Sequence, residues 1–338
     1  MTNFNKTIKN KGKMSNESFI NLFMLLVLVA TFAVASIFIP KFFSVAIVQN
    51  LFANNWYIII LGIGITFLLI TGHFDMSVGA TIALSGAVAA YLCQTTASGF
   101  SDLATGLGLG YGISVVIALL VCLFVGAINA FFIAKLRVAS IIVTLGTLSI
   151  SRGIAQVITQ GAQRSAGLPE AFGKIGSISI VGAIRISVII ALVFVAIALF
   201  VEKKTVFGRR TYLIGANKEA ARLSGIKVEK HITILYLISS LLAGITGLIL
   251  ASESEIAASS RGAGFEFNAL VVTLLGGTSI NGGFGSVIGT VVGALIIGVV
   301  ASAANALLLR PEWQFILKGV VTFLAILVQR YALDRRNA

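Results

Sequence analysis

The chain has 338 residues, of which 57% are apolar and only 11% are charged, and its mean hydropathy is +1.01. Soluble globular domains carry roughly 25% charged residues, so this composition excludes an ordinary water-soluble enzyme. The formal net charge of +13 comes from 25 Lys and Arg residues against 12 Asp and Glu residues. The basic residues lie between long apolar runs, which is typical of an integral membrane protein.

The apolar runs predict about ten membrane-spanning helices and therefore an all-α, polytopic fold. A spanning helix needs about 20 mostly apolar residues, because each residue adds about 1.5 Å along the helix axis. The predicted spans are 19–39, 47–71, 76–95, 105–134, 138–159, 184–201, 231–252, 264–280, 285–307 and 312–330.

Lys and Arg are distributed unevenly between the two sides of these spans. With a cytoplasmic N-terminus, 17 of the 25 basic residues fall on the cytoplasmic side, six fall outside, and two, Arg152 and Lys318, fall within spans. Cytoplasmic loops hold the excess of positive charge, so both termini are predicted to be cytoplasmic and no nucleic-acid partner is expected. The predicted organisation is a cytoplasmic tail (1–18), a transmembrane domain in the lipid bilayer (19–331) and a second cytoplasmic tail (332–338).

The N-terminus imitates a cleavable signal peptide, because a basic stretch and an apolar run precede the small residues Ala33-Val34-Ala35. The apolar run continues to Ile39, however, and is longer than the core of a typical signal peptide. We therefore expect the first span to be retained.

Two ionisable residues, His73 and Asp75, follow the second predicted span. A carboxylate just before a helix can accept hydrogen bonds from the first amide groups, so Asp75 is a candidate cap for the third span. Ionisable residues in a membrane protein are also functional candidates, and a gate is the alternative role for both residues. His73 could titrate near neutral pH, although a hydrogen bond to a neighbour is its simpler role.

A polar stripe runs along the fifth predicted span. Thr144, Thr147 and Ser151 recur at helical spacing, with Arg152 beside them. Hydroxyl groups and one guanidinium suit a solute with many hydroxyls, so these four residues are candidates for lining a translocation path. The alternative for Ser and Thr is hydrogen bonding between helices, and the alternative for Arg152 is a side chain that extends to the membrane surface.

Basic residues also lie in the loops that are predicted to be external. Arg164 and Arg185 flank a glycine-rich loop after the fifth span, and Arg261 follows the seventh span. Complementary charge orients a docking protein, so these three arginines are candidates for contact with an extracytoplasmic partner. Plain solvation of the loops is the alternative.

The longest polar segment, about residues 202–230, holds eight Lys and Arg residues and three Glu residues. Within it, good helix formers separate Asn217, an N-cap type of residue, from Gly225, a residue that ends helices. The pattern predicts a short surface helix, capped at both ends, on the cytoplasmic side. Such a helix suits docking onto a cytoplasmic partner, and a simple solvated loop is the alternative.

Four stretches form a series along the chain: Gly72–Gly79, Ile142–Gly146, Gly208–Ile226 and Gly264–Gly285. In this order they resemble motifs of the ribose/xylose/galactose-type permeases of ABC importers, and the resemblance covers about residues 45–330. The third stretch resembles the loop through which such permeases couple to an ATPase. The residues to which the resemblance assigns this coupling role are Gly208, Arg209, Gly215, Asn217, Ala221, Arg222 and Gly225.

The resemblance implies a non-catalytic, multi-pass transport subunit of the bacterial cytoplasmic (inner) membrane. The implied partners are a second permease chain in a homodimer, a cytoplasmic ABC ATPase with two nucleotide-binding halves and an extracytoplasmic sugar-binding protein. The implied solute is a monosaccharide, imported by alternating access. The sequence itself has no G-x-x-x-x-G-K-[ST] phosphate-binding loop. With only two His and two Cys residues, no catalytic residue, metal site or cofactor is expected in this chain.

His73, Phe74 and Asn268 depart from the residues that are frequent in the family, which leaves the identity of the sugar open. A nucleoside or a furanose-like signalling molecule is an alternative cargo for the same kind of permease. An ion-coupled secondary carrier is an alternative of another class. Such a carrier would need buried carboxylates around a coupling ion, and Glu266, at the start of the eighth predicted span, is the nearest candidate.

Overall fold

The computed structural model describes residues 16–95, 106–181, 184–310, 312–314, 316–317, 319–324 and 327, and these residues are mostly helical. The predicted tail 332–338, most of the tail 1–18 and Lys318 lie outside the described residues. The helices are α2 (Asn16–Phe38), α3 (Val45–Ile70), α4 (Val78–Cys93), α5 (Tyr111–Ala130), the π-helical turn η2 (Phe131–Lys135), α6 (Ser140–Thr159), α7 (Glu170–Ser177), α8 (Ile186–Lys204), α9 (Val206–Ala216), α10 (Lys218–Leu223), α11 (Val228–Ser254), α12 (Phe265–Leu275) and α13 (Val287–Ala306).

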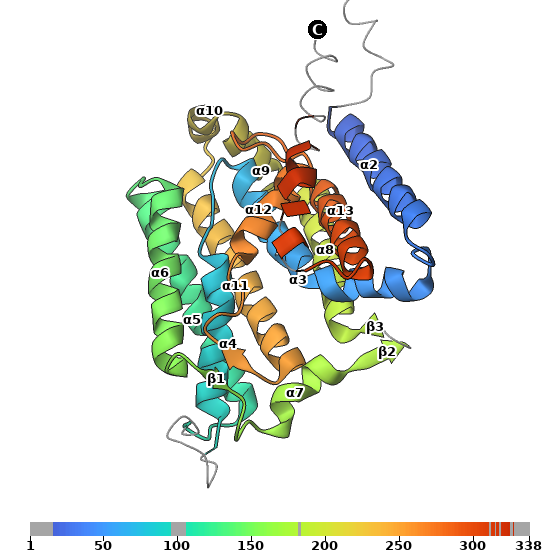
Figure 1. Cartoon of the computed structure of the whole chain (residues 1–338). Coiled ribbons are helices and arrows are strands. Elements are labelled where there is room, and N and C mark those ends of the chain that lie inside the picture. Colours follow the sequence, from blue (N-terminus) through green and yellow to red (C-terminus); the bar gives the residue numbers. More distant parts are fainter. Residues whose placement is uncertain are drawn as a thin grey trace, which may run out of the picture.

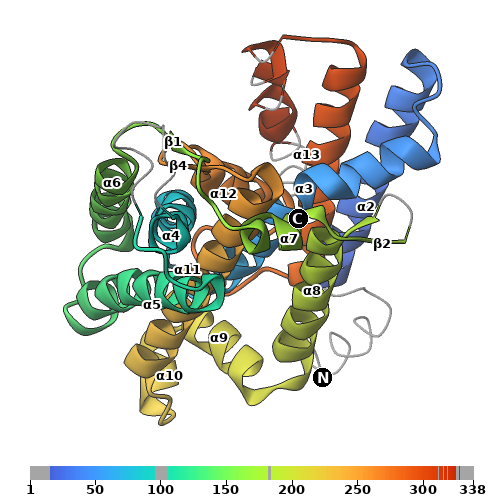
Figure 2. The ribbon, with the colours of Figure 1, turned by 90° about the horizontal axis from the view of Figure 1, so that it is seen from below.

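The long helices form a bundle around α3 and α11 (Figure 1). The most apolar segments of α3 and α11 are 83% and 72% buried, whereas those of α2 and α6 are 17% and 22% buried. In the perpendicular view, α4, α5 and α6 lie on one side of the bundle and α2 and α13 on another (Figure 2). The central helices therefore bury almost every face, and the outer helices leave apolar faces exposed, as expected for a protein surrounded by lipid.

Seven of the described helices are long and apolar enough to cross a membrane: α2, α3, α5 with η2, α6, α8, α11 and α13. The chain is therefore a mostly helical, polytopic membrane protein. Two predicted spans, 76–95 and 264–280, are corrected to shorter helices, because α4 has 16 residues and α12 has 11. The tenth predicted span, 312–330, lies partly outside the described residues, although 312–314, 316–317 and 319–324 are helical.

The two short helices, α4 and α12, begin inside the protein. The residues just before each of them are not helical. Asp75 and Ser77, just before α4, are 2% and 0% exposed, and Gly264, just before α12, has a left-handed backbone with φ of +81°. A Cβ at Gly79 would collide with the Glu266 carboxylate, so the starts of α4 and α12 meet. Irregular backbone is tolerated in a membrane protein where the surrounding protein buries it.

Two small antiparallel sheets qualify the all-α prediction. Strand β1 (Gln163–Arg164) pairs with β4 (Ala257–Ala258), and β2 (Ser179–Val181) pairs with β3 (Ile184–Arg185). The labelled strands β1, β2 and β3 and the helix α7 lie at the end of the bundle opposite α10 (Figure 1). The bundle therefore has one end made of α9 and α10 and another made of short strands and α7.

Candidate functional site

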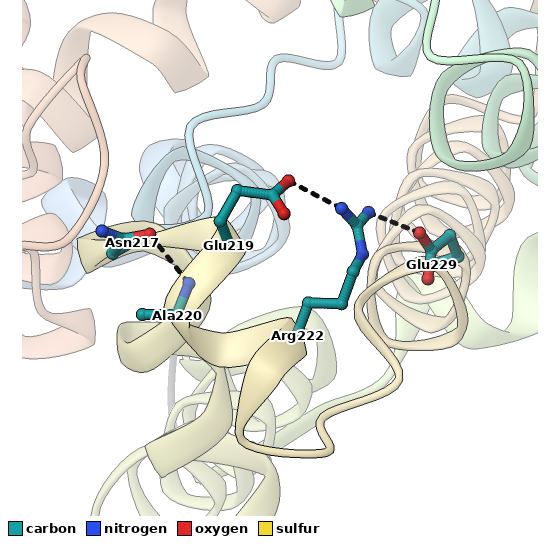
Figure 3. A network of polar contacts seen from close by, with 5 residues as sticks. All are labelled: Asn217, Glu219, Ala220, Arg222 and Glu229. Carbon is teal, nitrogen blue, oxygen red and sulfur yellow. Dashed lines mark hydrogen bonds and ion pairs between the residues drawn. The ribbon is translucent and has the colours of Figure 1, made fainter.

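The segment predicted to contain a surface helix folds as α9 and α10. The N-cap of α9 is Thr205, whose hydroxyl accepts a hydrogen bond from the amide of Gly208 at 3.1 Å. The N-cap of α10 is Asn217, whose Oδ1 accepts from the amide of Ala220 at 2.9 Å (Figure 3). Gly225 follows α10 with a left-handed φ of +80°, which a glycine adopts without strain. The prediction of a short helix capped at both ends is therefore confirmed.

Arg222 ties α10 to the beginning of α11. Its Nη1 lies 2.7 Å from Glu219 Oε1, and its Nη2 lies 2.6 Å from Glu229 Oε1 (Figure 3). Exposed ion pairs contribute little to stability, and only the pair with Glu229 links α10 to another helix. On the same helix Ala221 is buried and Leu223 is 89% exposed. Leu223 is therefore accessible on the surface of α10.

The other side of α9 packs tightly on the ends of α3 and α13. A Cβ at Gly215 would collide with the carbonyl of Ile70 and lie 2.6 Å from the amide of Gly283. The hydroxyl oxygen of Tyr212 lies 2.7 Å from both Glu202 Oε1 and the carbonyl oxygen of Gly285, and its one proton can be donated to either acceptor. A displacement of α9 would therefore be passed to the central helix α3 and to the start of α13.

Gly208 has the same kind of close contact, because a Cβ there would collide with the carbonyls of Val201 and Glu202 at the end of α8. Arg209, next to it, is exposed. Of the residues to which the family resemblance assigns coupling, Gly208, Gly215 and Ala221 thus face the bundle, whereas Arg209, Asn217, Arg222 and Gly225 lie wholly or partly at the surface.

Asp75 is the centre of a buried hydrogen-bond network. Its Oδ1 accepts from the amide of Ser77 at 3.0 Å and from the Ser77 hydroxyl at 2.5 Å, and its Oδ2 accepts from Ser239 Oγ at 2.7 Å. Asn129 Nδ2 donates to Ser77 Oγ at 2.9 Å, and Thr147 Oγ1 donates to Asn129 Oδ1 at 2.7 Å. The network connects the start of α4 with α11, α5 and α6.

His73 lies in the same connection between α3 and α4. Its Nδ1 is 3.0 Å from Thr71 Oγ1, and its ring is perpendicular to that of Tyr236. Burial, together with the positive charge of Lys218, lowers the pKa of His73 to about 4. His73 is therefore neutral at pH 7 and is held by a local hydrogen bond, which is the simpler of its two predicted roles.

The polar stripe of α6 faces the interior of the chain. Thr144, Thr147 and Ser151 are 0%, 7% and 2% exposed, and Thr147 belongs to the Asp75 network. The opposite face of α6 carries exposed Ile150 and Val157, at 63% and 78%. This placement favours hydrogen bonding between helices over lining a translocation path.

The predicted basic residues have three different environments. The Nη1 of Arg152 donates to the carbonyls of Ser259 and Arg261 at 2.5 and 2.7 Å, in the loop between α11 and α12. Arg185 is exposed, and Arg261, which is partly exposed, donates to the hydroxyl of Ser254 at 2.7 Å. The bonds of Arg152 hold the loop that precedes α12.

Arg164 corrects the expectation that all three docking candidates present their charge at the surface. It is 3% exposed, and its Nε donates to the carbonyl of Ile158 at 2.8 Å. Its Nη1 donates to Gln94 Oε1, and its guanidinium lies 5.1 Å from the centre of the Tyr91 ring. These contacts make Arg164 an internal residue that joins α4 to α6.

A polar cavity of about 170 Å³ lies between α3, α12, α13 and the helical residues that follow, and sequence analysis did not identify it. We call it the amide pocket. Among the residues that the structure describes, no charged side chain lines it. The lining residues are Asn54, Asn55, Tyr57, Ile58, Asn268, Ile297, Ala301, Ser302, Asn305 and Gln314. The adjacent amides Asn54 and Asn55, close to Gln49 and Asn50 in a helix that is apolar over most of its length, were the available sequence signal.

Glu266 lies at the start of α12 and is 6% exposed. Its Oε1 accepts a hydrogen bond from the amide of Gly264 at 3.2 Å, and its Oε2 has no hydrogen-bond partner among the residues that the structure describes. Over those same residues, no group of three His, Cys, Asp or Glu side chains could hold a metal ion. Glu266 is thus buried without a cluster of metal-binding side chains around it in the described part of the chain.

Comparison with known proteins places this architecture in a family. Residues 47–326 match the family described as "Branched-chain amino acid transport system / permease component". The ribose import permease proteins of Escherichia coli and Haemophilus influenzae are 34% and 33% identical over 318 residues, which cover 93% of this chain and 93% of each relative.

The L-arabinose transport system permease protein of Escherichia coli is 32% identical over 312 residues, which cover 91% of this chain and 90% of the relative. No solved structure matches the chain. The family model covers most of the chain, and the relatives match it over almost their full lengths. The chain is a member of the permease-component family of the branched-chain amino acid transport systems.

Proposed function

We propose that the chain is the non-catalytic permease subunit of an ATP-driven, binding-protein-dependent importer of a monosaccharide. Support comes from relatives whose names specify ribose import and L-arabinose transport and from the chemistry of the amide pocket. The proposal includes a location in the bacterial cytoplasmic membrane, ten membrane segments, of which two contain the short helices α4 and α12, and two cytoplasmic termini.

The observation that carries the choice of solute is the uncharged polar lining of the amide pocket. Each Asn or Gln amide offers two donors and one acceptor oxygen, and a hydroxyl offers both roles. These groups match a neutral molecule with many hydroxyls. An amino acid at neutral pH carries a carboxylate and an ammonium group, and burying either charge without a partner is costly. The lining therefore favours a sugar over an amino acid, although the family is named after amino acid transport.

The same lining disfavours the ion-coupled carrier, because coupling ions are bound by carboxylates or by several converging carbonyls. Glu266 is a single carboxylate that does not line the pocket. A nucleoside or a furanose-like molecule also presents hydroxyls, and competition against labelled ribose and arabinose distinguishes these cargoes. If a nucleoside competes more strongly than either sugar, the transported solute is a nucleoside and not a monosaccharide.

In the proposed complex, α9 and α10 dock onto a separate ATPase with two nucleotide-binding halves. A second copy of the permease completes the pathway, and an extracytoplasmic binding protein delivers the sugar at the opposite end, where Arg185 and Arg261 lie. The contacts of Gly215 and Tyr212 with the ends of α3 and α13 support mechanical coupling. Closure of the ATPase would move α9, and the central helices would then open the pathway inward.

Two exposed leucines provide a matched test of ATPase docking. Leu223 on α10 is 89% exposed. Leu308, which follows the C-terminal end of α13, is 90% exposed. The tagged chain is purified from gently solubilised membranes, and co-purifying proteins are identified by mass spectrometry. We expect one tandem ATPase for two permease chains with the wild type and Leu308→Asp, and loss of the ATPase with Leu223→Asp. Recovery of the ATPase with Leu223→Asp at the wild-type ratio would contradict this docking surface.

A further inference from the structure

A cavity of about 260 Å³ lies between α9 and the beginning of α11, separate from the amide pocket. We call it the basic cleft and define it by Phe207, Arg210, Ile226, Lys227, Lys230 and Ile234. We propose that the basic cleft binds the phosphate headgroup of an anionic phospholipid. This inference depends on the membrane location of the chain and is independent of the transported solute.

Three positive charges converge on the cleft, and no acidic side chain lines it. Arg210 comes from α9, and Lys227 and Lys230 come from the beginning of α11; all three are exposed. Within the described ranges, ion pairs are formed by Lys174 and Arg222 and by none of these three. The cleft therefore carries uncompensated positive charge, which attracts a phosphate diester.

The backbone of α11 adds to the positive electrostatic potential of the basic cleft. The helix has 27 residues, and the first bond of its ladder joins the amide of His231 to the carbonyl of Lys227. The amides of the preceding turn have no carbonyl within the helix, and the start of a long helix carries partial positive charge. Together with the three side chains, this arrangement is suited to an anion.

The walls of the cleft favour a lipid over a free anion. Phe207 stacks on His231, with ring centres 4.1 Å apart, and His231 Nε2 lies 2.8 Å from Thr211 Oγ1. These contacts fix an aromatic wall beside Ile226 and Ile234. The wall is mostly apolar, and the described polar groups that line the cleft are the three cations, His231 and the backbone at the helix start.

An apolar stripe leads from the cleft along α11. Ile234 lines the cleft, Ile238 is 36% exposed, and Leu241 and Ile245 on the same helical face are partly exposed. The spacing of three to four residues keeps these side chains on one face. An acyl chain attached to the bound phosphate can lie along this stripe, whereas inorganic phosphate makes no use of it. Basic pockets at the cytoplasmic ends of spanning helices are known to bind anionic headgroups.

The test is native mass spectrometry of the detergent-solubilised full-length chain, titrated with palmitoyl-oleoyl-phosphatidylglycerol or palmitoyl-oleoyl-phosphatidylcholine. The test variant combines Arg210→Gln, Lys227→Gln and Lys230→Gln. The control combines Lys135→Gln, Lys203→Gln and Lys204→Gln, which remove three exposed charges outside the cleft. We expect one phosphatidylglycerol per chain for the wild type and control, and an affinity weakened by on the order of a hundredfold for the test variant.

A melting temperature of the test variant equal to that of the control, measured without added lipid, shows that both remain folded. Equal retention of phosphatidylglycerol by the two variants, or equal binding of phosphatidylcholine by the wild type, would overturn the proposal. Displacement of the lipid by millimolar inorganic phosphate would identify a free-anion site instead. Loss of the ATPase from the test variant with unchanged lipid binding would identify the cleft as a protein-docking surface.

Discussion

The carboxylate of Asp75 accepts a hydrogen bond from the hydroxyl of Ser239, with 2.7 Å between Oδ2 and Oγ. Asp75 precedes α4 and Ser239 lies within α11, so this bond joins a short helix to one of the central helices. The other carboxylate oxygen binds Ser77 twice. Contrary to the prediction, Asp75 is not the N-cap of α4, because Ser77 occupies that position. It instead holds Ser77 and joins the start of α4 to α11, a connection that the sequence alone did not show.

We expect Asp75→Asn to destabilise the protein, because both carboxyl oxygens accept hydrogen bonds and the NH2 group of Asn cannot accept one. The expected loss is about 1–3 kcal/mol, measured as a lower melting temperature in detergent. Ser149→Ala is the control, since Ser149 is exposed and bonds only the carbonyl of Leu145 in the residues that are described. A melting temperature of Asp75→Asn equal to that of the control would exclude a stabilising network.

The contact of Gly215 with Ile70 predicts the effect of adding one methyl group. Gly215→Ala forces α9 away from the end of α3, with a cost of about 1–3 kcal/mol for this overpacking. We expect a severe loss of uptake with unchanged membrane insertion. Gly146→Ala is the control, because a Cβ at Gly146 meets nothing within 4 Å. Uptake by Gly215→Ala at the level of this control would contradict coupling through α9.

The amide pocket predicts a change in apparent affinity for the solute. Asn268→Ala removes one amide from the lining, and the loss of one neutral hydrogen bond weakens binding by roughly 2–13-fold. We expect the sugar concentration for half-maximal uptake to rise by this factor. Asn281→Ala serves as the control, since Asn281 is exposed and lies outside the pocket. An unchanged half-maximal concentration for Asn268→Ala would remove Asn268 from the pathway.

The lowered pKa of His73 leads us to expect that the stability of the protein depends on pH. Its pKa is lowered to about 4 in the folded chain, whereas an unfolded His has a pKa of about 6.5. Between these values only the unfolded state takes up the proton, so stability falls as the pH drops from about 6.5 to about 4, by at most about 1.4 kcal/mol per pH unit. Melting temperatures at pH 7.5 and pH 5 should therefore differ less for His73→Gln than for the wild type. An identical difference would show that His73 does not titrate in this way.

Hydropathy located the helices but not all of their ends. The predicted span 264–280 is apolar enough to cross a membrane, yet α12 has only 11 residues. The helix begins after the left-handed Gly264 and ends at Gly276, where a Cβ would collide with Gly289 of α13. A count of apolar residues does not include such contacts between distant segments, so the shortening was not predictable from composition.

Features that depend on neighbouring residues in the sequence were predicted more successfully than side-chain environments that depend on distant residues. The caps of α10 depend on Asn217 and Gly225, which lie within the same short segment, and they were predicted correctly. The environment of Arg164 depends on Gln94, which is 70 residues away in the chain. Asn54 and Asn268 likewise meet only through the packing of α3 against α12. Contacts between residues that are distant in the sequence can be identified only when the fold is known.

The central claim is tested most directly by transport in proteoliposomes. The purified chain is reconstituted with its co-purified ATPase and binding protein, and uptake of labelled D-ribose, L-arabinose and L-leucine is measured with and without ATP. We expect ATP-dependent uptake of one of the sugars, no uptake of leucine, and no response to an imposed sodium or proton gradient. ATP-dependent uptake of leucine alone, or sugar uptake driven by an ion gradient without ATP, would contradict the account.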